Sequence, residues 1–102
     1  MKIIKELSDD IECTIANATY NAQQAVELKD DHKSIAEVYY KMSVDNLSHV
    51  LMLHGEVVKL IDDYRKTNGD PPEPMLAVYN YLHKKHIEAV QEAKNYQIMY
   101  KE

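Results

Sequence analysis

Residues 43–56, with the sequence SVDNLSHVLMLHGE, carry the side chains of this chain that are best suited to chemistry. Within this segment Asp45 supplies a carboxylate, Asn46 an amide, and His49 and His54 two imidazoles. Carboxylates and imidazoles ligate metal ions, and imidazoles also exchange protons near neutral pH. Residues three apart share a face of a helix, so Asn46 and His49 act together if the segment is helical. The segment is therefore a metal site, the remnant of one, or a packed helix that carries histidine.

The elements that must position these groups are helices. Apolar residues recur at spacings of three, four and seven, which predicts amphipathic helices over about residues 3–29, 32–67 and 74–100. Ser34 and Glu37 have the spacing of a capping box, and a Gly-Asp-Pro-Pro run follows the second helix. Short connections make consecutive helices antiparallel neighbours. We therefore predict an all-α fold, an up-down-up chain of three antiparallel helices.

The composition fits a single helical domain over residues 1–102. The 2 glycines and 3 prolines leave little turn chemistry for strands. The net charge of −5 argues against nucleic acid or an anionic membrane surface as a partner, because phosphate binding needs a basic stripe. Cys13 is the single cysteine, so a reducing compartment is expected. With no signal-peptide pattern and no apolar stretch near the ~20 residues that span a bilayer, we expect a cytoplasmic protein.

The predicted second helix turns two polar groups toward its apolar side. At about 100° per residue, Asn46 lies near the centre of the apolar stripe and His49 roughly 60° to one side. Burying either group without a partner costs about 1–3 kcal/mol. Folding the first helix back places Glu12 opposite His49. We expect Asn46 and His49 to be buried, with His49 hydrogen-bonded to Glu12 or Asp45 and no metal bound tightly.

The predicted third helix contributes two more histidines. His86 falls on its inner stripe at the height of His54, where an interhelical hydrogen bond or an interface contact is expected. His83 and His32 are expected to face solvent.

The run from Tyr39 to His49, YYKMSVDNLSH, resembles the ligand helix of ferritin-like proteins such as rubrerythrins and encapsulated ferritins. The signature of that family is Glu-x-x-His on an inward helix face, with a single Glu one helix earlier. The resemblance places the family's His at His49 and its Glu at Asn46, and it matches the earlier Glu to Glu12. Asn is a poor ligand for a hard cation, which prefers carboxylate oxygen. The resemblance therefore implies a ferritin-like bundle with an eroded metal centre.

The resemblance extends over about residues 12–101, where the texture is similar to small ferritin-like proteins of bacteria and phages. A second Glu-x-x-His is missing, and the third helix has His83-x-x-His86 instead. A complete four-helix di-iron site is thus absent from one chain, although dimerisation completes half-sites in some proteins.

Two functions follow from these residues. The first is non-enzymatic: a ferritin-like bundle without a cofactor, which acts through self-association or by binding another protein. The alternative is a metalloprotein that holds iron or zinc at a site shared between subunits, and that is a ferroxidase-like oxidoreductase if it is an enzyme. Its candidate ligands are Glu12, Asp45, His49, His54 and His86. Three long thin helices expose much surface, so a homodimer or larger homo-oligomer is expected. A hydrolase or transferase is not supported, because Ser43 and Ser48 have no activating constellation and no Gly-rich phosphate loop is present.

Overall fold

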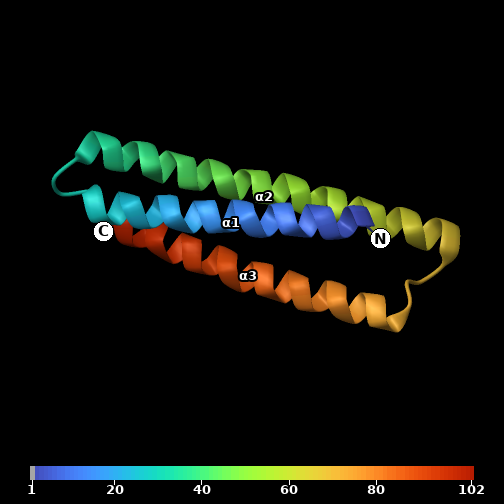
Figure 1. Cartoon of the computed structure of the whole chain (residues 1–102). Coiled ribbons are helices and arrows are strands. Elements are labelled where there is room, and N and C mark those ends of the chain that lie inside the picture. Colours follow the sequence, from blue (N-terminus) through green and yellow to red (C-terminus); the bar gives the residue numbers. More distant parts are fainter. Residues whose placement is uncertain (1) are drawn as a thin grey trace.

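The computed structural model describes residues 2–102, apart from the side chain of Met75, and has three helices (Figure 1). α1 spans Lys2–Leu28, α2 spans Lys33–Asn68 and α3 spans Glu73–Lys101. Every helix end lies within one residue of the end predicted from the sequence, and residues 2–102 contain no strand. The predicted all-α, up-down-up architecture is confirmed.

α1 is the central helix of the bundle. It packs along both α2 and α3, whereas α2 and α3 touch each other at few points. The three helices form a rod of 56 × 18 × 18 Å. Figure 1 shows α2 running alongside α1, whereas α3 lies close to α1 near the C-terminus of the chain and diverges from it toward the α2–α3 connection. Across residues 2–102, none of the helices combines the length and the apolar character needed to cross a membrane.

The size of the buried side chains changes along the rod. The closely packed end is built from alanines that are completely buried: Ala18, Ala22, Ala25, Ala36 and Ala93. The core toward the other end is made of larger residues: Ile11, Ile15, Val50 and Val57. Helix separation depends on the side chains at the contact, so small residues at one end and large ones at the other explain why α3 diverges from α1.

The cap at the start of α2 differs from the one predicted from the sequence. The helix begins at Lys33, with His32 at the N-cap position and no hydrogen bond from its side chain to the helix. Ser34 therefore lies inside the first turn, where the predicted capping box with Glu37 cannot form. Glu37 instead pairs with Lys41 one turn later, at 3.2 Å.

The end of α2 is as predicted. Gly69 has φ 78°, in the left-handed range that glycine adopts most easily, and its N–H donates to the carbonyl of Arg65 at 3.0 Å. Pro74 then lies in the first turn of α3, where its missing N–H leaves no helical bond unmade.

The buried alanines predict that the closely packed end of the bundle tolerates no larger side chains. Ala22→Leu forces a larger side chain between helices with no free space, so we expect a loss of about 1–3 kcal/mol in the free energy of unfolding. Ala16 is exposed on the same helix, and Ala16→Leu is the matched control. Urea denaturation followed by circular dichroism measures both, and equal effects of the two variants would contradict this packing.

Candidate functional site

Two of the predicted site residues, Asp45 and His49, lie on the surface. Both are exposed, so the prediction of a buried His49 is wrong. The buried residues of α2 are Ala36, Ser43, Val50 and Val57, and we call this line of residues the buried seam. Val50 lies about 40° round the helix from Asn46, so the buried seam is rotated by that angle from the predicted inner face. His49 therefore lies about 100° away from the buried seam. The sequence prediction centred the inner face on the large apolar residues and missed this rotation.

Glu12 pairs with a different partner from the one predicted. Its carboxylate forms an ion pair with the ammonium group of Lys85 on α3, and both side chains are about half exposed. This hydrogen bond, together with the charge of Glu12, raises the pKa of Lys85. Because the pair is half exposed, its contribution to stability is small. Glu12 therefore links α1 to α3, and the expected contact between Glu12 and His49 is replaced by this ion pair.

Asn46 has a partner within the chain. Its Oδ1 accepts a hydrogen bond from Nδ2 of Asn21 at 2.9 Å. Asn21 is only 6% exposed, while Asn46 is half-buried. The inward direction predicted for Asn46 is thus partly correct, and an amide of α1 satisfies it.

A second polar contact, one turn away, joins all three helices. Ser43 is completely buried; its hydroxyl donates to the carbonyl of Ala18 at 2.7 Å and accepts from Nε2 of Gln97 at 2.8 Å. Sequence reasoning missed Ser43 as a packing residue. The available signal was its heptad spacing, seven residues from both Ala36 and Val50 on the buried seam.

Three histidines gather where α2 faces α3. The rings of His54 and His83 stack with centroids 4.8 Å apart and an interplanar angle of 23°. Tyr79 stacks on His83 at 5.9 Å. Nε2 of His86 is buried and has no hydrogen-bond partner within the described part of the chain. The prediction that His83 faces solvent is wrong, because its ring is half-buried in this stack.

The geometry of this cluster does not favour chelation. The lone pair of an imidazole nitrogen lies in the plane of the ring, so two stacked rings direct their nitrogens side by side rather than at one point. Among residues 2–102, no group of three or more His, Cys, Asp or Glu side chains is placed to hold a metal ion. Of the five predicted ligands, Asp45 and His49 lie on the surface and Glu12 pairs with Lys85. The other two, His54 and His86, belong to the histidine cluster.

Burial and repulsion from neighbouring cationic side chains favour the neutral form of two of these imidazoles, His54 and His86. Burial lowers the pKa of His54, and the neighbouring His83 lowers it further. Burial also lowers the pKa of His86; Lys85, His83 and His54 add to this effect, and Glu12 opposes it. His54 and His86 therefore resist protonation within this contact between α2 and α3.

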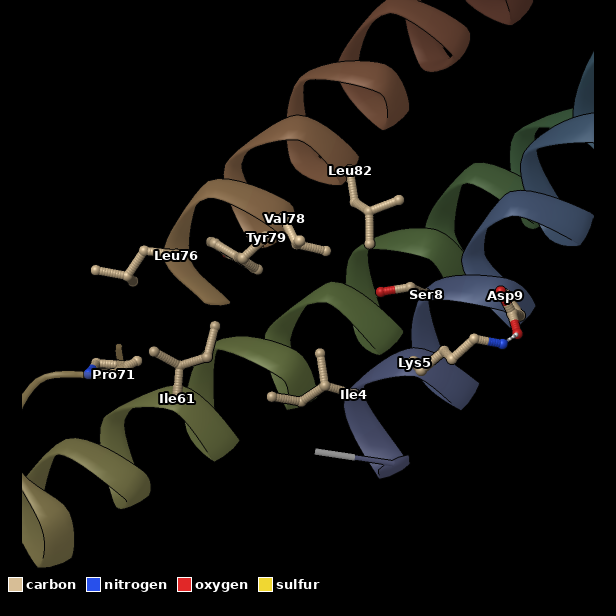
Figure 2. Close-up of a pocket in the computed structure, with 10 residues that line it drawn as sticks. All are labelled: Ile4, Lys5, Ser8, Asp9, Ile61, Pro71, Leu76, Val78, Tyr79 and Leu82. Atoms are coloured by element: carbon tan, nitrogen blue, oxygen red, sulfur yellow. Dashed lines mark hydrogen bonds and ion pairs between the residues drawn. The ribbon is translucent and has the colours of Figure 1, made fainter. Parts of the chain in front are cut away.

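An apolar cavity of about 380 Å³ lies beside the cluster, where the helices spread apart (Figure 2). Its walls come from all three helices and include Ile4, Ile61, Leu76, Tyr79 and Leu82. Tyr79 also stacks on His83. The histidine cluster and the cavity thus share one side chain.

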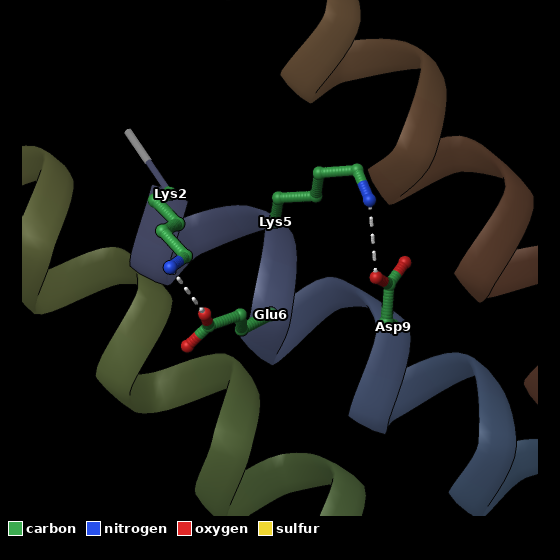
Figure 3. A network of polar contacts seen from close by, with 4 residues as sticks. All are labelled: Lys2, Lys5, Glu6 and Asp9. Atoms are coloured by element: carbon green, nitrogen blue, oxygen red, sulfur yellow. Dashed lines mark hydrogen bonds and ion pairs between the residues drawn. The ribbon is translucent and has the colours of Figure 1, made fainter.

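The polar rim of the cavity is neutralised within α1. Lys5 and Asp9 line the cavity and pair at 3.4 Å; Lys2 and Glu6, which lie outside the lining, pair at 4.0 Å on the same helix (Figure 3). All four side chains are largely exposed. Pairs of this kind stabilise a helix by only about 0.3–0.5 kcal/mol. They leave no uncompensated charge at the rim to attract an ionic ligand.

The fold and these contacts define an all-α three-helix bundle with polar contacts between its helices. Comparison with protein-family models, with curated proteins and with solved structures found no match to this chain.

The amide pair predicts a non-additive mutational response. Asn46→Leu leaves the buried amide of Asn21 without its partner, so we expect a loss of about 1–3 kcal/mol in the free energy of unfolding. The double variant Asn21→Leu/Asn46→Leu should recover much of this loss, because it removes both polar groups. A double-mutant cycle by chemical denaturation measures the coupling, and additive losses would show that the two amides do not depend on each other.

The histidines predict a loss of stability in acid. The unfolded chain binds protons at the ordinary pKa of about 6.5, and the folded chain binds them at a lower pKa at His54 and His86. The free energy of unfolding should therefore fall as the pH drops below about 6.5, and level off once the folded histidines are also protonated.

The matched variants for this test are His86→Leu and His32→Gln. His86→Leu removes a buried nitrogen without a partner, so it should flatten the pH profile and raise stability near neutral pH by about 1 kcal/mol. His32 is exposed at the start of α2, and His32→Gln should keep the wild-type profile. A His86→Leu profile as steep as the wild type would contradict the role of His86.

Proposed function

We propose that this chain is a non-enzymatic, ferritin-like helical-bundle protein that acts by associating with itself. The observation that carries the proposal is its large accessible surface of 6902 Å². A folded monomer of 11.8 kDa is expected to expose about 5,900 Å². The excess of about 1,000 Å² resembles the ~800 Å² that each partner contributes to a standard protein interface.

The nature of the exposed surface supports this proposal. α2 carries a series of large apolar side chains that are each at least 38% exposed: Ile35, Val38, Met42, Val44, Leu51, Met52 and Val58. α3 carries a second series: Val78, Tyr81, Ile87, Ile98 and Met99. Exposed apolar side chains that gather on one face of a helix often mark a protein–protein interface. A partner chain would remove such side chains from water.

The surroundings of Asn46 support the eroded metal centre. Asn46 occupies the position of glutamate in the ferritin-like motif. Its side-chain amide accepts a hydrogen bond from the amide of Asn21, which carries no charge. This pair satisfies the inward polar side chain without an ion. His49, at the position of the motif's histidine, is exposed.

The second candidate function is a metalloprotein that binds iron or zinc at a site shared between two chains. One observation favours it: the buried Nε2 of His86 has no hydrogen-bond partner in the described chain. A neutral imidazole nitrogen of this kind is a good ligand for both metals.

The test is the mass of the purified protein in solution together with its metal content. Sedimentation equilibrium should give a dimer or a larger assembly at micromolar concentration, with no stoichiometric metal. A monomer at this concentration would contradict the proposal. Stoichiometric iron or zinc that is lost in His86→Ala would favour the metalloprotein instead.

A further inference from the structure

α2 carries a second heptad repeat on its solvent side, separate from the seam that packs on α1. The middle of this repeat is Val44, Ser48, Leu51, Gly55 and Val58. The spacings alternate between four and three, as in the contact seam of a coiled coil. All five residues are exposed, Leu51 by 73%. We refer to this repeat, from residue 37 to residue 65, as the outer seam.

Large and small side chains alternate along the outer seam. Ser48 and Gly55 separate the three apolar residues. An antiparallel copy centred on Leu51 places Ser48 opposite Gly55 and Val44 opposite Val58, so the two backbones can approach closely beside the small residues.

Gly55 has no explanation within its own chain. Glycine in the interior of a helix costs about 1 kcal/mol relative to alanine. A Cβ added at Gly55 would meet nothing within 4 Å, so packing inside the described chain does not require glycine there. Close approach of a second helix would require it.

The charges at the two ends of the outer seam are complementary in the antiparallel sense. The repeat begins with Glu37 and Lys41 and ends with Asp62 and Arg65, all exposed. If an identical helix lies antiparallel with a two-fold axis near Leu51, Glu37 faces Arg65 of the second copy and Lys41 faces its Asp62. A parallel pairing would instead place like charges together.

We propose that the outer seam pairs with the outer seam of a second copy of this chain, antiparallel and two-fold symmetric about Leu51. The inference rests on the proposed self-association and assigns it a surface and an orientation. The paired segments would run for about 43 Å. The symmetric, self-complementary pattern is the kind that a two-fold homodimer needs.

The first test changes the centre of the outer seam. Leu51→Glu places two carboxylates together at the axis and should weaken the dimer by at least ~100-fold in Kd, measured by sedimentation equilibrium. Met42→Glu alters another exposed apolar residue of α2, outside the outer seam, and should leave the dimer intact. Gly55→Gln should also weaken the dimer while it favours the helix, so its effect cannot be assigned to poor folding.

The second test examines the orientation through charge exchange. Glu37→Arg and Arg65→Glu each place like charges together in the antiparallel dimer and should weaken it by about tenfold. The double variant Glu37→Arg/Arg65→Glu restores opposite charges across the axis and should recover the wild-type Kd. In a parallel dimer, the double variant would gain nothing over the single ones.

The outcomes separate this inference from the proposed function. A monomeric wild-type protein would overturn the self-association itself. A dimer that survives Leu51→Glu and Gly55→Gln but dissociates in Met42→Glu would overturn only the outer seam. A dimer that depends on Leu51 but is not restored by the double charge exchange would overturn the antiparallel orientation.

Discussion

The fold depends on the contacts of a single helix, α1, with the other two. α2 and α3 meet at few points, so the side chains of α1 determine where each of them can lie. The alanines at one end of α1 allow close approach, and the larger Ile11 and Ile15 fill the core toward the end where α3 diverges from α1. The cavity near Tyr79 and the position of the histidine cluster both follow from this change in spacing.

The polar contacts of Ser43 and Asn46 fix how the helices are aligned along their axes, which the apolar contacts leave open. Alanine and valine faces slide past one another at little cost, because their contacts are not directional. Ser43 binds the carbonyl of Ala18 and the amide of Gln97, and Asn21 binds Asn46. Sliding α2 by a turn would break all three of these bonds at once and leave buried polar groups unpaired, which is costly.

The sequence predicted the helices well because their ends depend on local chemistry. The apolar periodicity and the end signals at Gly69 and Pro74 depend only on residues close together in the sequence. Each helix end therefore lies within one residue of its predicted position. The rotation of α2 depends on non-local packing and was predicted less well. Its seam includes Ser43, which carries no apolar signal, so the inner face was centred about 40° from Val50 and His49 was placed inside. The Glu12–Lys85 pair was also missed, because α1 and α3 are distant in sequence.

The position of α1 between two helices that barely touch has a consequence for local opening. α3 is held mainly by α1, with a few contacts to α2, whereas α1 is held from both sides. Opening of α3 therefore breaks one set of contacts and can leave the α1–α2 hairpin in place, whereas opening of α1 breaks both sets. Amide hydrogens of α3 will exchange with solvent ahead of those in the middle of α1, so the bundle unfolds in an order set by its connectivity in space, not by its order in sequence.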